Sequence, residues 1–180
     1  ATLQLRRETK RLSEVNAELR RLAIEDPLTG LANRTLVFDR LTQALGRRRR
    51  SDSLLGVLFC DVDSFKPIND RLGHQAGDHL LCIIAERLST AGRVTDTVAR
   101  LAGDEFVVVC PDLGEAEDLQ RIARRVAEAV SVPARVGGMD VTPSMSIGSA
   151  LAELGDDAES LLGRADEAMY VAKWRTRLGE

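Results

Sequence analysis

The sequence predicts an α/β fold: a mixed, largely antiparallel central sheet flanked by helices and preceded by an N-terminal helical stalk. Three observations predict it. Short apolar runs alternate with longer segments whose apolar residues recur at helical spacing. Two pairs of these short runs are joined by glycine-containing turns, at residues 102–105 and 137–138, and such hairpins join antiparallel strands. Residues 1–25 contain neither glycine nor proline, so we divide the chain into a stalk, residues 1–25, and a globular domain, residues 26–180.

The composition is that of an ordinary globular domain. The 180 residues are 44% hydrophobic, and 25 basic against 28 acidic side chains give a net charge of −3. This balance argues against nucleic-acid binding, and no apolar run approaches the roughly 18 residues of a membrane-spanning helix. Cys60, Cys82 and Cys110 lie in apolar stretches without paired or metal-ligand spacing, so we expect buried thiols in a reducing compartment. We therefore expect a cytoplasmic domain without direct membrane contact, which a longer natural chain can tether to a membrane or a sensor domain.

The stalk is the first predicted element. Leucines recur every seven residues with further apolar residues between them, and this is the pattern of a coiled-coil seam. The seam residues are Leu5, Leu12, Val15, Leu19 and Leu22. A solvated amphipathic helix is the alternative interpretation.

The other elements follow in chain order. The stalk helix should end near Asp26-Pro27, because the residue before a proline is disfavoured in helical geometry, and a second helix should start at Asn33, a good cap residue. A basic cluster at residues 47–50 ends this helix. The expected strands are 54–60, 97–101, 106–110, 134–136, 139–141 and 144–152; the later helices are 76–88, 115–130 and one from about Asp157 to about residue 177.

The first chemical signal is an apolar strand that ends in Asp61-Val62-Asp63. Carboxylates at the mouth of a sheet suit Mg²⁺, which proteins hold through one or two carboxylates plus substrate phosphates. The tight turn that follows places the amides of residues 64–66 at the start of a helix, where phosphate binds, and Pro67 suits the first helical position. On its own the acidic pair is a weak signal, because such pairs also serve as turn and cap residues.

A second acidic pair, Asp104-Glu105, lies at the tip of a predicted hairpin. Adjacent carboxylates repel one another, so such a pair is either solvated or neutralised by a cation. If the two strands concerned are neighbours in the sheet, Asp61 and Asp104 converge on one site. Sites with two metal ions of this kind activate a hydroxyl and clamp a phosphoryl group.

Six ordered motifs resemble those of the GGDEF domain family, the diguanylate cyclases of bacteria. They are residues 26–34, 61–70, 73–78, 100–106, 144–148 and 165–173, so the resemblance covers about residues 25–177. It implies a sheet of the nucleotidyl cyclase or polymerase-palm type and makes residues 26–180 a GGDEF-like catalytic domain. The signature turn reads Ala102-Gly103-Asp104-Glu105-Phe106, where the family usually begins with glycine. The added methyl group either fits at small cost or crowds the nucleotide, and we expect activity to be retained.

The resemblance implies condensation of two GTP molecules into cyclic di-GMP with release of two pyrophosphates. Asp61, Asp104 and the backbone carbonyl of Val62 would hold two Mg²⁺ or Mn²⁺ ions. Glu105 would help at the metals and accept the 3′-hydroxyl proton, since deprotonating a ribose hydroxyl near neutral pH needs metal assistance. Lys66 would act in catalysis as well as in binding.

The resemblance also implies the substrate-binding residues. Those at the phosphates would be Ser64, Phe65, Lys66, Lys173 and Arg177. Asn69 and Asp78 would read guanine, because a carboxylate accepts from the two adjacent donors that guanine presents and adenine lacks. The usual Gly-Arg-Asn after the last helix reads Thr176-Arg177-Leu178 here, which weakens the match at Arg177.

Regulation and assembly are implied in the same way. Arg93-Val94-Thr95-Asp96, five residues before the signature turn, is similar to the family's Arg-x-x-Asp site for inhibition by the product, with a surface ion pair as the alternative. Because the product is two-fold symmetric and each domain would hold one GTP, catalysis should need a homodimer paired through the stalk and the catalytic face. Two alternatives remain open: a catalytically weak module that binds GTP or cyclic di-GMP, and a dimerising interaction domain.

Overall fold

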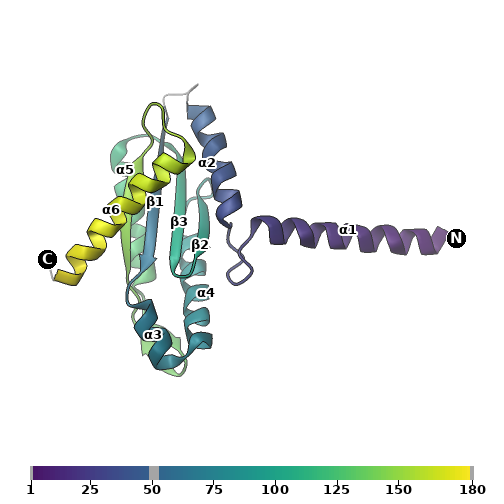
Figure 1. Ribbon diagram of the computed structural model, residues 1–180, viewed down its shortest axis with the longest axis horizontal. Helices are drawn as coiled ribbons and strands as arrows, with labels where there is room; N and C mark the ends of the chain where they lie inside the picture. Colours follow the sequence, from purple (N-terminus) through teal and green to yellow (C-terminus); the bar gives the residue numbers. More distant parts are fainter. Residues whose placement is uncertain (1, 49–52, 179–180) are drawn as a thin grey trace.

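The computed structural model describes residues 2–48 and 53–178, without the side chains of residues 2, 3, 5, 17, 20 and 176–178. Helices and strands alternate along these ranges (Figure 1). The helices are α1 (Thr2–Ile24), α2 (Arg34–Arg48), α3 (Phe65–Leu72), α4 (His74–Ala91), α5 (Ala116–Val130) and α6 (Ala158–Leu178). The strands are β1 (Leu54–Val62), β2 (Thr97–Ala102), β3 (Glu105–Leu113), β4 (Ala134–Val136), β5 (Met139–Val141) and β6 (Met145–Leu151).

The main sheet has the strand order β2-β3-β1-β6, and each neighbouring pair in it is antiparallel. The predicted antiparallel sheet with flanking helices is thus confirmed, and both predicted hairpins are present, as β2-β3 and as the separate pair β4-β5. Parallel pairing within the described ranges is limited to an isolated bridge between Ala32 and Ala99. Strand β3 lies between β1 and β2, so the crossover through α3 and α4 spans one intervening strand, as in a split β-α-β arrangement.

Helices cover both faces of the sheet, and this explains why β1 is apolar along almost its whole length. Its side chains alternate: Leu58, Cys60 and Val62 pack in the core formed with α4 and α5, whereas Val57 and Phe59 pack in the core formed with α2 and α6. In Figure 1, α6 crosses in front of the strands. The odd-numbered side chains of β1 therefore face α6, and the even-numbered ones face α4.

Helix α6 packs closely on the edge strand β6 because of one glycine. A Cβ atom at Gly148 would lie 2.0 Å from the Met169 amide nitrogen and 2.2 Å from the Ala165 carbonyl oxygen. A larger residue would push the α6 backbone off the sheet. This close approach carries the following turn of α6, with Lys173, to the end of β1.

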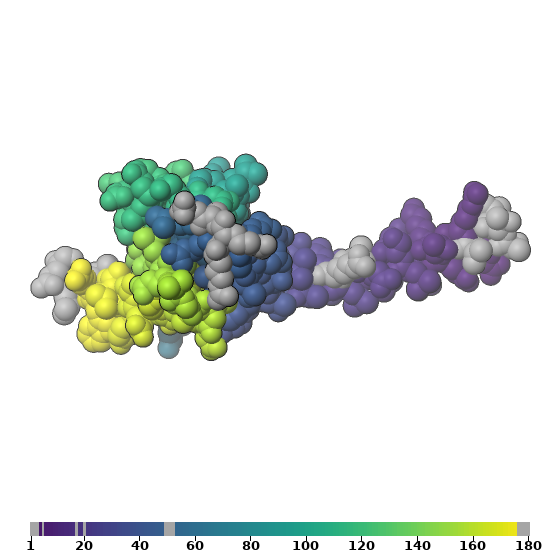
Figure 2. Space-filling view, turned by 90° about the horizontal axis from the view of Figure 1, so that it is seen from above, coloured from purple at the N-terminus to yellow at the C-terminus, as the bar shows by residue number. Residues whose placement is uncertain are grey.

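The stalk helix α1 projects away from the body of the molecule (Figures 1 and 2). Of the predicted seam, Leu12, Val15, Leu19 and Leu22 are exposed, and the Leu5 side chain lies outside the described residues. The helix ends at Ile24, as predicted from Pro27. None of the helices in the described ranges combines the length and the apolar character needed to cross a bilayer.

Several local predictions are confirmed and one is corrected. Asn33 caps α2, accepting from the Leu36 amide at 3.1 Å, and Asp157 caps α6, accepting from the Ser160 amide at 2.8 Å. Pro67 is the third residue of α3, not the first. Proline is tolerated there because the first four amides of a helix have no intrahelical acceptor.

The cysteines are free thiols, with Cys60 and Cys110 buried and Cys82 half-buried. Burial raises the pKa of the Cys60 thiol to about 12. Cys60 and Cys110 are therefore core residues, as the sequence predicted, whereas Cys82 is not fully buried and its thiol donates to the Leu28 carbonyl at 3.4 Å.

Candidate active site

Two acidic segments far apart in the sequence meet where β1 and β3 pair. Asp61 lies directly opposite Glu105 in the register, and the Val62 amide donates to the Asp104 carbonyl oxygen at 3.1 Å. Because hydrogen-bonded and non-hydrogen-bonded pairs alternate in an antiparallel ladder, Asp61 and Glu105 form a non-hydrogen-bonded pair, whose side chains are close together on one face. The convergence of Asp61 with the 104–105 turn, on which the sequence argument depended, is observed.

The parity of β1 turns Asp61 toward α6. There the Lys173 ammonium donates to Asp61 Oδ1 at 2.5 Å, and the Asp61 side chain is only 10% exposed. A nearly buried carboxylate needs such a partner, because an unpaired buried charge is costly. Lys173, which the resemblance places at the triphosphate, is thus directly beside the acidic group.

The carboxylates crowd one another. Burial, followed by the negative charge of Asp61, raises the pKa of Asp104 above its ordinary value. Burial also raises the pKa of Glu105, followed by the charges of Asp166, Asp61 and Asp104. Lys173 opposes both shifts. A second cation at this end of the sheet would relieve the remaining repulsion.

The donor set is compatible with a divalent ion that also binds a substrate. Within residues 2–48 and 53–178, no group of three or more His, Cys, Asp and Glu side chains is arranged to hold a metal by itself. Mg²⁺ does not require one, since one or two carboxylates with substrate phosphates and water suffice. Asp61, Asp104 and the Val62 carbonyl supply the hard oxygen atoms that such an ion takes.

The second aspartate of the Asp-x-Asp pair has a different environment. Asp63 accepts hydrogen bonds from the Ser144 and Ser146 hydroxyls, both at 2.7 Å, and its amide donates to the Ser144 carbonyl at 2.9 Å. These bonds use both of its carboxylate oxygens. Asp63 therefore ties β1 to the start of β6, while Asp61 faces the site.

The turn after β1 presents backbone amides. Ser64 has a positive φ of 55°, a left-handed conformation that is unusual for a residue with a side chain, and α3 begins at the next residue, Phe65. The Ser64 side chain makes no capping hydrogen bond and is exposed, as is Lys66. The N-terminus of α3, with its free amides and a lysine, is suited to bind phosphate.

Asn69 carries the clearest sign of a missing ligand group. Its Oδ1 atom is buried and has no hydrogen-bond partner among the described residues. It lies against α4, where a Cβ atom at Gly77 would be 1.7 Å from it, and the exposed Asp78 is the next residue. An unsatisfied buried acceptor costs about 1–3 kcal/mol, so a donor from a ligand such as a nucleobase would account for it.

The inhibitory-site candidates are found bound to each other. Arg93 Nε and Nη2 donate to Asp96 Oδ1 at 3.0 and 2.8 Å, and the Arg93 amide donates to Asp96 Oδ2 at 2.7 Å. Arg93 Nη2 also donates to the Pro111 carbonyl at 2.7 Å, and the Asp96 side chain has no exposed surface. The pair precedes β2, roughly 17 Å along that strand from the signature turn. Asp96 thus orients Arg93, whose side chain is about one-third exposed.

Sequence reasoning gave no role to two residues that the structure brings to the site. Arg100 Nη1 donates to both Asp26 oxygens at 3.1–3.2 Å, and Arg100 Nε donates to the Gly103 carbonyl at 2.9 Å. Asp166 on α6 shares a pocket of about 230 Å³ with Glu105. Both residues lie within motifs that the sequence analysis recognised. The motifs did not indicate which side chains these two residues contact. The side chain of Arg177 lies outside the described residues.

Comparison with known proteins gives consistent matches. A family model described as "Diguanylate cyclase, GGDEF domain" matches residues 23–178. The chain is 44% identical over 169 residues to the diguanylate cyclase TpbB of Pseudomonas aeruginosa, covering 93% of this chain and 39% of TpbB. It is 43% identical over 169 residues to the bifunctional diguanylate cyclase/cyclic di-GMP phosphodiesterase MucR of the same species, covering 93% of this chain and 24% of MucR.

Solved structures agree. The GGDEF domain of TpbB superposes with a TM-score of 0.81 at 44% identity, covering 84% of this chain and 89% of that one. The coiled coil and GGDEF domain of DgcB from Caulobacter crescentus, in complex with c-di-GMP, superposes with a TM-score of 0.84 at 28% identity, covering 96% and 95%. The chain spans well under half the length of the curated relatives TpbB and MucR.

Proposed function

The chain belongs to the GGDEF family of diguanylate cyclases, and from this premise we propose that it condenses two GTP molecules into cyclic di-GMP with release of two pyrophosphates. The observation that carries the proposal is the meeting of Asp61 with the Asp104-Glu105 turn at one end of the sheet. The family match alone would be compatible with a domain that has lost its acidic site.

We assign the binding roles from the geometry above. The guanine base lies between Asn69 and Asp78, where it offers a donor to the unpaired Asn69 Oδ1. The triphosphate lies at the amides of Ser64 and Phe65 beside Lys66, with Lys173 contributing from α6. The role of Arg177 at the phosphates rests on the family resemblance alone. Lys173 lies close to the phosphates because its ammonium group already contacts Asp61.

The reaction needs a 3′-hydroxyl that attacks an α-phosphate. Two Mg²⁺ or Mn²⁺ ions, held by Asp61, Asp104 and the Val62 carbonyl with Glu105 nearby, would lower the pKa of this hydroxyl and neutralise phosphate charge. Glu105 accepts the hydroxyl proton, and its raised pKa, caused first by burial and then by the neighbouring carboxylates, favours that role. Lys66 stabilises charge on the phosphates during the attack.

Each domain would hold one GTP, so the active assembly would be a homodimer with two-fold symmetry. The exposed seam of α1, Leu12 to Leu22, would pair the two stalks. Product would bind at Arg93, oriented by Asp96, and inhibit. We also propose a cytoplasmic location, which the free thiols support.

The test is a turnover assay. The purified chain with GTP and Mg²⁺ or Mn²⁺ should yield cyclic di-GMP identified by mass spectrometry, and Asp104→Asn should abolish it while leaving the circular dichroism spectrum unchanged. Asp39→Asn, on the exposed part of α2, is the matched control. Absence of product with either metal would contradict the proposal.

One observation favours a second candidate. Ala102 stands at the first position of the signature turn, where a bulge interrupts the pairing of β2 with β3. If its methyl group crowds the nucleotide, the domain would be a catalytically weak module that binds GTP or cyclic di-GMP. Calorimetric binding of either nucleotide without turnover, together with restored turnover in Ala102→Gly, would select this candidate.

A further inference from the structure

Strand β6 is an edge of the main sheet, with β1 on one side. Two backbone hydrogen bonds at its ends establish its register: the Ala152 amide donates to the Leu55 carbonyl at 2.8 Å, and the Asp63 amide donates to the Ser144 carbonyl at 2.9 Å. Hydrogen-bonded pairs alternate along an antiparallel ladder, so the even-numbered residues of β6 bond to β1. The backbone groups of the odd-numbered residues point away from the sheet: Met145, Ile147, Ser149 and Leu151.

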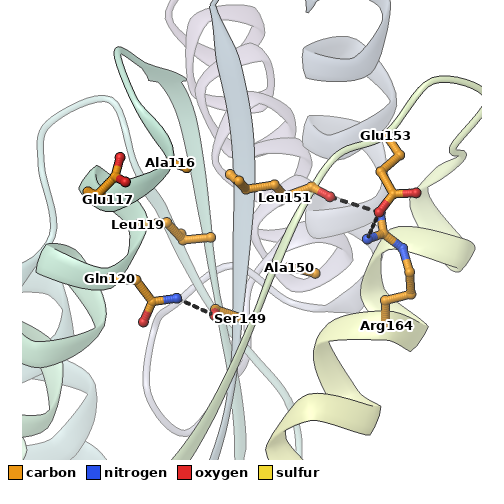
Figure 3. A pocket seen from close by; sticks show the side chains of 9 residues that line it. All are labelled: Ala116, Glu117, Leu119, Gln120, Ser149, Ala150, Leu151, Glu153 and Arg164. Atoms are coloured by element: carbon orange, nitrogen blue, oxygen red, sulfur yellow. Dashed lines mark hydrogen bonds and ion pairs between the residues drawn. The ribbon is translucent and has the colours of Figure 1, made fainter.

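A groove of about 410 Å³ lies along this edge (Figure 3). One wall is the first part of α5, with Leu119 and Gln120, and the other is α6, with Arg164. Residues 149–151 of β6 form its floor between the two helices. The groove is at the end of the sheet opposite to Asp61, because Leu151 pairs with Gly56 near the start of β1.

Only some of the outward backbone amides and carbonyls of β6 form hydrogen bonds. Arg164 Nη2 donates to the Leu151 carbonyl at 2.9 Å, whereas Gln120 Nε2 donates to the Ser149 hydroxyl at 3.0 Å and leaves its backbone free. In the described part of the chain, no hydrogen bond reaches the outward amides and carbonyls of Ile147 and Ser149. A row of unpaired groups on an edge strand is a template for another strand.

The shape and the charge of the groove limit what can fill it. Helices stand on both sides of the edge, so a single extended segment fits, whereas a second sheet carrying its own helices would collide with them. Glu117 and Glu153 border the groove, and the guanidinium of Arg164 is shared between Glu153 and Asp156. Among the lining residues two glutamates stand against one arginine, so the groove has a small net negative charge, and this favours a basic segment.

We propose that the β6 edge is a docking site for an extended, basic peptide segment of a partner protein, which adds to the sheet as a further strand beside β6. The backbone of the segment bonds to Ile147 and Ser149, and its side chains alternate between the two walls. Apolar residues face Ala116 and Leu119, and lysine or arginine residues face Glu153. This site is separate from the acidic end of the sheet and does not depend on the proposed function.

The test uses a capped hexapeptide that alternates lysine and valine, titrated into the ¹⁵N-labelled protein. Binding should shift the amide resonances of Ile147, Ser149 and Leu151 and slow hydrogen exchange at Ile147 and Ser149. The same peptide with N-methyl groups at alternate residues keeps every side chain but cannot complete the ladder, so it should bind about tenfold more weakly or worse. Equal binding of the two peptides would overturn the proposal.

Variants of the protein separate backbone pairing from charge. Ser149→Pro removes an outward amide without breaking a bond to β1 and should abolish the exchange protection. Glu153→Lys should weaken binding about fivefold at low salt, while Glu128→Lys, the same change at an exposed position on the far end of α5, should not. Absence of any shift along β6 would refute the proposal. So would self-association in sedimentation that Ser149→Pro abolishes, because the edge would then bind a second copy.

Discussion

Replacement of Asp26 by asparagine should destabilise the domain in a way that depends on pH. The Asp26 carboxylate accepts from the Thr29 amide at 2.8 Å, from the Thr29 hydroxyl at 2.7 Å and from Arg100 at 3.1–3.2 Å. The Asp26 side chain is 16% exposed and the Arg100 side chain 13%. Arg100 also holds the Gly103 carbonyl, so this ion pair connects the loop after the stalk to the signature turn.

The magnitude follows from these contacts. Asparagine keeps an acceptor for Thr29 but presents a neutral group to Arg100. The variant therefore loses the charge-assisted hydrogen bonding between Asp26 and Arg100, two side chains that are mostly buried. Such an interaction is worth about 1.5–3 kcal/mol, and we expect Asp26→Asn to lower the free energy of unfolding by about 2 kcal/mol at pH 7.

The pH dependence has a definite sign. Burial acts to raise the pKa of Asp26, but the hydrogen bonds from Thr29 and Arg100 outweigh it and hold the pKa below its usual value. A carboxyl with a depressed pKa stabilises the fold above its unfolded pKa, and this contribution is lost as the pH falls through the folded pKa. The difference between the wild type and Asp26→Asn should therefore be complete at pH 7 and shrink from about pH 5 downward.

Urea unfolding followed by circular dichroism at pH 7, 5, 4 and 3 measures this difference. Asp39→Asn, an exposed carboxylate on α2, should change the free energy of unfolding by no more than about 0.5 kcal/mol at each pH. A destabilisation by Asp26→Asn of the same size at pH 3 as at pH 7 would refute the electrostatic reasoning, and none at pH 7 would refute the role of the ion pair.

Three further predictions concern the other parts of the site. Gly77→Ala would put a methyl group 1.7 Å from Asn69 Oδ1 and displace that side chain. Initial-rate kinetics should show a KM for GTP about tenfold higher, with an unchanged unfolding midpoint. Adding Asn69→Ala to this variant should not raise the KM further, because both changes remove the same contact. Arg93→Ala leaves the buried Asp96 carboxylate without its guanidinium, so urea unfolding should show a loss of about 3 kcal/mol and added cyclic di-GMP should no longer inhibit; intact inhibition would contradict the proposed site. Leu19→Lys should dissociate a stalk-paired dimer in sedimentation experiments and lower turnover per chain, whereas Ser13→Lys, also exposed on α1 but off the seam, should do neither.

The sequence by itself determined most helices and strands, and the aspartate at the end of strand β1. Asn33 and Asp157 cap the helices that they were predicted to cap, Pro27 follows the end of the stalk helix, and the glycines at 103 and 137–138 lie in the two hairpin turns. These features depend on neighbours a few residues away, so the chain itself contains the information. The buried β1 strand ending in Asp61 follows equally from a local apolar run.

Only the tertiary structure decided which side chains meet. Three contacts join segments more than 70 residues apart: Lys173 with Asp61, Arg100 with Asp26, and Asp63 with Ser144 and Ser146. No local sequence pattern predicts these contacts, because they depend on the strand register and on how closely α6 packs over Gly148. The sequence did not predict the groove beside β6 either, since the order of the strands in the whole sheet decides which strand lies at an edge.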